Sequence, residues 1–145
     1  MKKLILALAL VFTISCAFAN DVTVTRQVLN SFKSNFYNAK DITWTHTNTY
    51  YKAAFTLNEQ KVFAFFDLDG EYLGLSRYIS SVQLPVSLLS SLKKHYGQKW
   101  ITDLFEVANE EGTSYYITVE DADTKLVLMS TTGSEWSVYK KSEKI

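Results

Sequence analysis

The sequence predicts an α+β fold. In it, a helix followed by a four-stranded antiparallel meander occurs twice, as a tandem repeat, and the strands form one curved antiparallel sheet with two helices on one face. Apolar residues recur at helical spacing in 25–37 and 84–97, and each stretch is followed by alternating apolar and polar residues. Gly70 of the first half returns at nearly the same place in the second half as Gly133. Because a single helix covers only one face of such a sheet, the repeat places both helices on the same side.

The first half, about 25–79, begins with an amphipathic helix at 25–37, because its apolar residues share one helical face. Asp69-Gly70 predicts a type I′ hairpin turn, which needs positive φ at both central residues, and 58–60 predicts an earlier turn. Between and around these turns, the period of two predicts strands at 42–44, 51–57, 62–66 and 72–78.

The second half, about 84–140, opens with another helix. Pro85 lies in its first turn, where a missing N–H costs nothing, and Gly97 is expected to end it. The lysine-rich stretch 140–144 is expected to be a solvated end. Alternation and turn signals predict four further strands at 100–107, 114–120, 125–130 and 135–139.

Composition narrows the classes of function. The chain has 145 residues, with 15 Lys+Arg against 15 Asp+Glu, which argues against a strongly basic nucleic-acid binder. A single cysteine argues against a disulfide framework and against a cysteine-rich zinc site. The sequence shows no glycine-rich phosphate loop, nucleophile elbow or His-Glu metal helix, so we expect no cofactor and no enzymatic activity.

Residues 1–19 have the pattern of a signal peptide. Lys2 and Lys3 precede an apolar run at 4–14, which is too short to span a bilayer, and 17–19 reads Ala-Phe-Ala. We expect cleavage after residue 19, leaving a single domain at 20–145 that is exported to the periplasm or beyond the cell.

An alternative processing route uses Cys16. The stretch Thr13-Ile14-Ser15-Cys16 is similar to a degenerate lipobox, and a lipid on Cys16 would anchor the domain to a membrane. Under signal-peptide cleavage this cysteine would be lost instead, and the mature protein would have no thiol. No later stretch is apolar for long enough to predict a transmembrane helix.

Several polar groups have a plain structural interpretation. The acidic stretch 67–71 has its glycine in the fourth place and fails the EF-hand spacing, so we expect a turn and no metal site. His46 and His95 lack a third ligand and are expected at the surface or at a helix end. The acidic pairs 110–111 and 121/123 are expected in solvated turns, because catalytic carboxylates must face each other across a cleft.

One strand in each half is apolar on both faces. In 62–66, Phe63 and Phe65 lie opposite the other three apolar residues, and in 125–130, Val127 and Met129 lie opposite Leu126 and Leu128. Two explanations remain open: a second cover formed by curvature, a loop or a partner subunit, or an exposed patch that binds protein or peptide. The residues expected to extend this second surface are Tyr50, Tyr116 and Trp136.

Four stretches together carry a family resemblance: Phe36-Tyr37-Asn38-Ala39-Lys40-Asp41-Ile42-Thr43-Trp44, then Tyr51 to Phe55, then Phe66 to Glu71, then Leu84-Pro85. The chain resembles the PepSY-like, β-lactamase-inhibitor-like family of secreted bacterial proteins that is common among Bacteroidetes. The resemblance implies a tandem α+β fold similar to the β-lactamase inhibitor protein and an exported location. It implies no established activity, and no lactamase-binding residue is carried over. The second half departs from the pattern, with Thr131-Thr132-Gly133-Ser134 in place of the acidic turn.

The function expected from these observations is that of an exported, non-enzymatic binding module. It would engage a protein or peptide through the sheet face that carries Phe63, Phe65, Val127 and Met129. The alternative is a structural or self-associating cell-envelope module that buries the same apolar face against a second copy. A hydrolase is disfavoured, because no nucleophile, base and orienting group can be named together.

Overall fold

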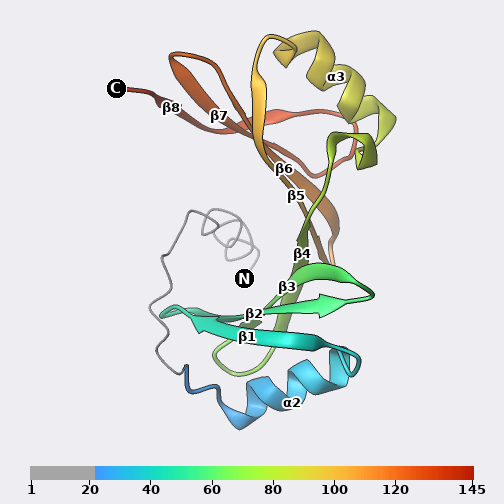
Figure 1. Ribbon diagram of the computed structural model, residues 1–145, viewed down its shortest axis with the longest axis vertical. Coiled ribbons are helices and arrows are strands. Elements are labelled where there is room, and N and C mark those ends of the chain that lie inside the picture. Colours follow the sequence, from blue (N-terminus) through green and yellow to red (C-terminus); the bar gives the residue numbers. More distant parts are fainter. Residues whose placement is uncertain (1–21) are drawn as a thin grey trace. The chain divides into compact units, whose positions relative to one another are not determined.

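The computed structural model describes residues 22–145, which form two compact units (Figure 1). Unit 1 runs to Leu75 and unit 2 spans Ser76–Ile145, so that strand β4 contributes residues to both. The predicted signal segment 1–19 and Cys16 lie outside the described residues. None of the helices between residues 22 and 145 is both long and apolar enough to cross a membrane.

The α+β class and the antiparallel sheet are confirmed. Eight strands are hydrogen-bonded in chain order, from β1 to β8. In both halves a helix is followed by four strands. That the two halves are copies of one duplicated unit stays a prediction. The elements of the described residues are α2 (Arg26–Asn35), β1 (Lys40–His46), β2 (Tyr50–Leu57), β3 (Gln60–Asp67), β4 (Tyr72–Tyr78), a 3-10 helix η2 (Ser81–Gln83), α3 (Val86–Tyr96), β5 (Trp100–Asn109), β6 (Gly112–Glu120), β7 (Thr124–Ser130) and β8 (Ser137–Glu143).

Unit 1 is built on the apolar face of α2, which lies against the strands of this unit (Figure 1). The Thr25 hydroxyl caps the helix by accepting the backbone N–H of Val28 at 3.4 Å. Phe32 lies at the centre of the core, because its ring contacts those of Phe55 and Phe66 at centroid distances of 5.0 and 6.2 Å. The buried residues of this core are Val28, Phe32, Ala53, Phe55, Val62, Ala64 and Phe66.

Unit 2 has its own core beneath α3. Pro85 is the N-terminal cap residue of α3, and Gly97 follows its last residue, as the sequence predicted. Leu88 and Leu92 are the buried residues of this helix, one turn apart on the face that meets the strands. The buried residues of this core are Ile79, Leu84, Leu88, Leu92, Leu104, Ile117, Val119 and Leu128.

The Asp69-Gly70 turn differs from the predicted type I′ geometry. Only Gly70 has positive φ, at +92°, and its N–H donates to the carbonyl of Asp67 at 3.2 Å. The Asp67 carboxylate accepts the N–H groups of Asp69 and Glu71, which fixes a three-residue loop with its glycine in the last place. The hydrogen bonds of the Asp67 side chain therefore determine the geometry of the loop, and the Asp-Gly pair alone did not indicate this role.

The two-residue turn with positive φ at both positions is instead the one between β2 and β3. Asn58 has φ of 49° and Glu59 has φ of 65°, and the flanking residues Leu57 and Gln60 are directly paired. This is the geometry of a type I′ turn. Glu59 adopts it without the conformational freedom of glycine, so the turn stores strain.

The last strand is displaced from its predicted position. β8 covers Ser137–Glu143 instead of 135–139. The lysine-rich stretch expected as a solvated end is exposed, and it also pairs with β7. Lys144, just beyond it, donates to Glu120 at 2.7 Å and to the carbonyl of Asp121 at 2.9 Å. Most residues of β8 are exposed, so this edge strand carries no apolar period that could have revealed it.

Substituting Gly70 tests the close approach of this loop to α2. An alanine Cβ at Gly70 would lie 3.0 Å from the carbonyl carbon and oxygen of Gln27, in addition to the positive φ. We expect Gly70→Ala to lower the free energy of unfolding by about 2–3 kcal/mol, measured by urea denaturation. Gly112→Ala is the control, because φ there is +124° but no atom lies within 4 Å; it should cost about 1 kcal/mol. Equal losses would show that the contact with Gln27 is unimportant.

Glu59→Gly should stabilise the protein. Glycine removes the left-handed strain at this position, and the gain is partly offset by greater freedom of the unfolded chain, leaving about 0.5 kcal/mol in favour of the variant. Thermal unfolding measures the change. Glu111→Gly is the matched control, because Glu111 also lies in a two-residue turn but does not have positive φ. A control that stabilised the protein equally would contradict the strain at Glu59.

Candidate binding surfaces

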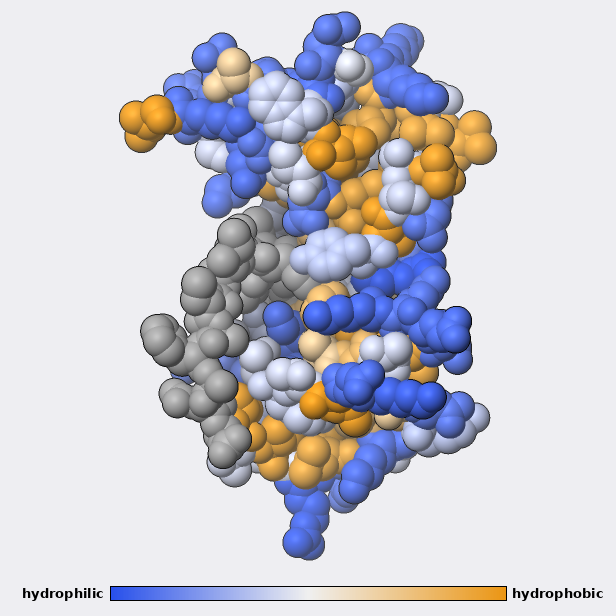
Figure 2. Space-filling view, in the orientation of Figure 1, coloured by the Kyte–Doolittle hydropathy of each residue, from blue (hydrophilic) through white to orange (hydrophobic). Residues whose placement is uncertain are grey.

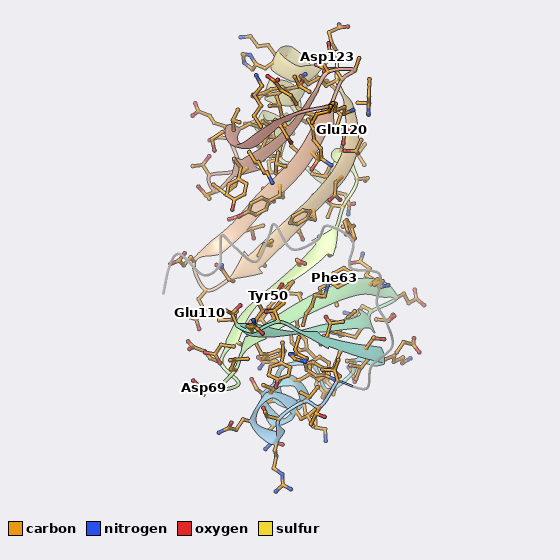
Figure 3. All side chains as sticks on the ribbon, turned by 90° about the vertical axis from the view of Figure 1, so that its left-hand side faces the viewer. Tyr50, Phe63, Asp69, Glu110, Glu120 and Asp123 are labelled. Carbon is orange, nitrogen blue, oxygen red and sulfur yellow. The ribbon has the colours of Figure 1, made fainter. Side chains whose placement is uncertain are left out.

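Three aromatic residues predicted for the second sheet surface meet in unit 1. Tyr50, Phe63 and Phe65 form a cluster of their own, which we call the unit-1 aromatic cluster, and Figure 3 shows Tyr50 and Phe63 on the side of the strands away from α2. The rings of Tyr50 and Phe65 have centroids 5.7 Å apart. The exposed fractions of these residues are 6%, 9% and 2%, respectively, so the three side chains are buried and do not form an exposed patch. Val62, Ala64 and Phe66 pack instead in the core beneath α2, so the two-sided pattern predicted for this strand is confirmed.

Two lysines flank the ring of Phe63. The Nζ atoms of Lys52 and Lys61 lie 5.6 and 5.9 Å from its centroid. Burial lowers the pKa of Lys52, and the charge of Lys61 lowers it further. Both distances are within the range of a cation–π interaction with this ring. These lysines were not predicted from the sequence, although Lys52 lies two residues from Tyr50 on the same face of β2 and directly opposite Phe65.

A row of four aromatic residues crosses unit 2 on the side away from α3. Phe105 and Tyr116 stack with centroids 5.2 Å apart and planes 11° apart. Tyr139 meets Tyr116 edge-on at 6.0 Å, and Tyr78 meets Phe105 edge-on at 6.3 Å. Burial raises the pKa of Tyr116, and Tyr139 raises it further. We call these four residues the unit-2 aromatic row.

Val127 and Met129 share the face of this row. Each is directly opposite a residue of that face, because Val127 pairs with Thr118 and Met129 pairs with Tyr116. Both are half-buried. Leu128 belongs to the opposite core, so the two-sided pattern predicted for β7 is confirmed. The sequence did not predict the other members of the row, which are Tyr78, Phe105 and Tyr139. Phe105 could have been predicted, because pairing β5 with β6 across the turn before Gly112 places it opposite Tyr116.

Trp136 does not belong to this face, which corrects the prediction. Its ring packs against the core beneath α3, and its Nε1–H donates to the carbonyl of Leu88 at 3.0 Å. The predicted alternation failed because β8 begins only at Ser137, so Trp136 precedes the strand. In this position the indole N–H has a hydrogen-bond acceptor, which a buried tryptophan usually requires.

The other polar residues selected from the sequence lie in separate turns, strands and helices. Figure 3 shows Glu110 and Asp123 at opposite ends of unit 2, so the two acidic turns do not face each other across a cleft. His46 ends β1 in unit 1, whereas His95 lies in the last turn of α3, as expected. Within residues 22–145, no group of three or more His, Cys, Asp or Glu side chains is placed to hold a metal ion.

Asp121 has a structural role in the β6–β7 turn. Its carboxylate forms an ion pair with Lys99 and accepts the N–H groups of Asp123 and Thr124 at 3.0 and 2.7 Å. The hydrogen bond from Lys99, followed by those from the turn backbone, lowers the pKa of Asp121 far below its ordinary value of 3.8. Lys99 also donates to the hydroxyl of Thr124 at 2.9 Å, so one lysine ties the end of α3 to this turn.

The comparisons with known proteins bear on the fold. No family model and no curated protein matches the chain. Among solved structures, a BLIP-like protein from Bacteroides fragilis NCTC 9343 is 21% identical, with a TM-score of 0.71 over 84% of this chain and 87% of that one. The chain has the BLIP-like fold.

Two further structures agree with this fold. A DUF2874 family protein from Bacteroides ovatus ATCC 8483 has a TM-score of 0.74 at 19% identity, covering 84% of this chain and 89% of that one. A protein from Bacteroides eggerthii DSM 20697, named as a candidate periplasmic protein, has a TM-score of 0.73 at 17% identity, covering 84% and 90%. The inhibitor-like architecture implied by the sequence resemblance is thus confirmed, and the PepSY-like label stays a prediction.

Asp121→Asn should make the protein less stable at neutral pH and less sensitive to acid. Because the pKa of Asp121 is lower in the folded state, its stabilisation is present above 3.8 and is lost as pH falls through the lower folded-state value. The difference in unfolding free energy between wild type and variant should therefore shrink below about pH 4. Asp123→Asn is the control, because its carboxylate takes no part in these hydrogen bonds. A difference that is constant with pH would contradict the role of Asp121.

Proposed function

We propose that this chain is a non-enzymatic binding module of the cell envelope, which binds a protein or peptide partner through the face of the unit-2 aromatic row. The observation that carries the proposal is the apolar character of this face. A sheet covered by a helix on one side ordinarily presents polar residues on the other. Here the face away from α3 carries stacked Phe105 and Tyr116, which are themselves buried, at 5% and 4% exposed. The aromatic and apolar surface that a partner can reach on this face comes from Tyr78 and from half-buried Tyr139 and Met129.

The composition of this face suits recognition. Aromatic side chains supply large contact areas at little cost in conformational entropy, and they are enriched at the energetic centres of protein interfaces. Tyr78 offers an exposed ring at the margin of the row, with 51% of the residue accessible. Val127 and Met129 add an adaptable apolar border, because methionine repacks readily around a partner.

The chemistry of the same face supports binding over catalysis. Burial raises the pKa of Asp103, whereas the charge of Lys125 lowers it. A carboxyl group with a raised pKa could act as an acid, but hydrolysis also requires a base or nucleophile within hydrogen-bond reach. His95, the histidine of unit 2, does not supply one, because it belongs to α3 on the other side of the strands.

Export to the envelope is part of the proposal. Its support is the signal-peptide pattern at 1–19, with Cys16 as the alternative lipid attachment site. The structurally similar protein from Bacteroides eggerthii DSM 20697 is named as a candidate periplasmic protein, which agrees with this location. A partner would then be another envelope or extracellular protein.

The test replaces the apolar border of the face with charge. Val127→Lys/Met129→Lys in the mature protein should abolish capture of a specific partner from envelope extract. The purified partner should then bind the double variant at least tenfold more weakly, because burying a lysine in an apolar contact costs more than about 1.4 kcal/mol. Val138→Lys is the matched control, because Val138 is 56% exposed in unit 2 and pairs with Leu128 of the other face.

Two outcomes would overturn the proposal. If the partner is retained by the double variant, while circular dichroism shows an intact fold, the binding face lies elsewhere. The second outcome concerns self-association and is measured by light scattering. If the wild type is a dimer and only the double variant is monomeric, the face binds a second copy of this chain and not a foreign partner.

A further inference from the structure

A second candidate surface lies on the opposite side of unit 2, beside α3. Here the helix and the strands leave an open pocket of about 150 Å³, which we call the α3 pocket. Leu92 and Val119 are buried residues of the unit-2 core, so the pocket reaches down to that core. Its lining residues are Ser81, Leu89, Leu92, Lys93, Tyr96, Gly97, Lys99, Ile101 and Val119.

The size and lining of this pocket fit one apolar side chain. A cavity of about 150 Å³ lined by aliphatic residues accommodates a benzene-sized group. Leu89, Tyr96 and Ile101 supply the apolar walls. Ile101 remains 42% exposed although it is a large hydrophobic residue in a β-strand, which leaves apolar surface that a partner could cover.

The surroundings of the pocket extend this apolar surface. Val82 of η2 and Val86 of α3 are 82% and 81% exposed. Figure 2 shows hydrophobic side chains gathered on the α3 side of unit 2, next to strongly hydrophilic ones. Single exposed valines are common. Val82 directly follows the lining residue Ser81, and Val86 lies three residues before the lining residue Leu89 on α3, so both are near the pocket along the chain.

The charge that α3 contributes beside the pocket is positive, whereas the lining residue Lys99 forms an ion pair with Asp121. Lys93 lines the pocket, and Lys94 and His95 follow it in the last turn of α3, whose sequence contains no acidic residue. A lysine at the C-terminal end of a helix complements the helix dipole, and this effect is sufficient to explain the presence of one lysine here. The helix dipole does not explain why an apolar pocket lies between this end of α3 and the strands. Lys99 is already paired with Asp121, so Lys93 and its neighbours set the charge that a ligand would meet.

We propose that the α3 pocket binds an acidic peptide segment and holds one large apolar side chain of that segment, such as leucine or phenylalanine. Carboxylates flanking the anchor would lie near Lys93 and Lys94, so charge complementarity gives orientation and the pocket gives affinity. A lipid surface fits less well, because interfacial helices bury a protruding apolar face in the bilayer, whereas this site is concave. The site does not depend on the proposed function, which uses the other face of unit 2.

Fluorescence anisotropy with short blocked peptides tests this assignment on the mature protein. The probe is Asp-Glu-Leu-Glu-Asp carrying a terminal fluorophore, and the matched peptides are Asp-Glu-Ala-Glu-Asp and Lys-Lys-Leu-Lys-Lys. Loss of the leucine anchor should weaken binding about tenfold, since burial of such a side chain is worth about 1.5 kcal/mol or more. The basic peptide should bind at least as weakly as the alanine peptide.

Variants of the protein separate charge from shape. Lys93→Glu should weaken the acidic peptide about tenfold at low salt, and Ile101→Glu should do the same by placing a carboxylate at the pocket. Lys140→Glu makes the same charge change on exposed β8 and should have little effect. Circular dichroism verifies that each variant is folded.

Three results would overturn the proposal. Equal binding of the leucine and alanine peptides would remove the anchor pocket. Equal losses in Lys93→Glu and Lys140→Glu would reduce the effect to net charge. Binding to phosphatidylglycerol vesicles that is lost in Lys93→Glu, without binding of the leucine peptide, would assign the surface to a membrane.

Discussion

Each unit depends on the packing of one helix against one face of its strands. In unit 1 the ring of Phe32 joins α2 to Phe55 and Phe66, and in unit 2 Leu88 and Leu92 do the same for α3. This packing fixes the register of the strands, because a shift by one residue would exchange the two faces. Among residues 22–145, no helix covers the other face of either unit. The aromatic residues on those faces are therefore the feature of the fold that requires a further explanation.

The sequence was most informative where strands are apolar on both sides. Alternation along β3 and β7 separated Phe63 and Phe65 from Phe66, and Val127 from Leu128, because side chains in a strand must point to opposite faces. The helices and their ends were also predictable, since Pro85 and Gly97 have defined places at helix termini.

The sequence was least informative where tertiary hydrogen bonds decide the geometry. The Asp69-Gly70 loop takes its shape from the side chain of Asp67, and Trp136 takes its place from the carbonyl of Leu88. Neither interaction leaves a periodic pattern in the chain. Lys52 and Lys61 were missed for a related reason: a lysine in a strand normally indicates a solvated position, whereas these two lie over Phe63.

Unit 2 thus combines two surfaces of different character. The aromatic row is broad and contains stacked rings, which suits a folded partner, whereas the α3 pocket is small and has cations beside it, which suits an extended segment. The ion pair of Lys99 with Asp121 stabilises the turn next to the pocket. A site preorganised in this way loses less conformational entropy when it binds.

The outer strands β1 and β8 each have a hydrogen-bonded neighbour on one side only. In β1 the register shifts between Lys40 and Thr43, where Asp41 has positive φ, and in β8 the exposed residues include Lys140 and Lys141. A bulge and edge lysines both oppose the addition of a foreign strand. A protein built in this way resists edge-to-edge polymerisation even when it is concentrated, and its two edges are poorly suited to accepting a further strand.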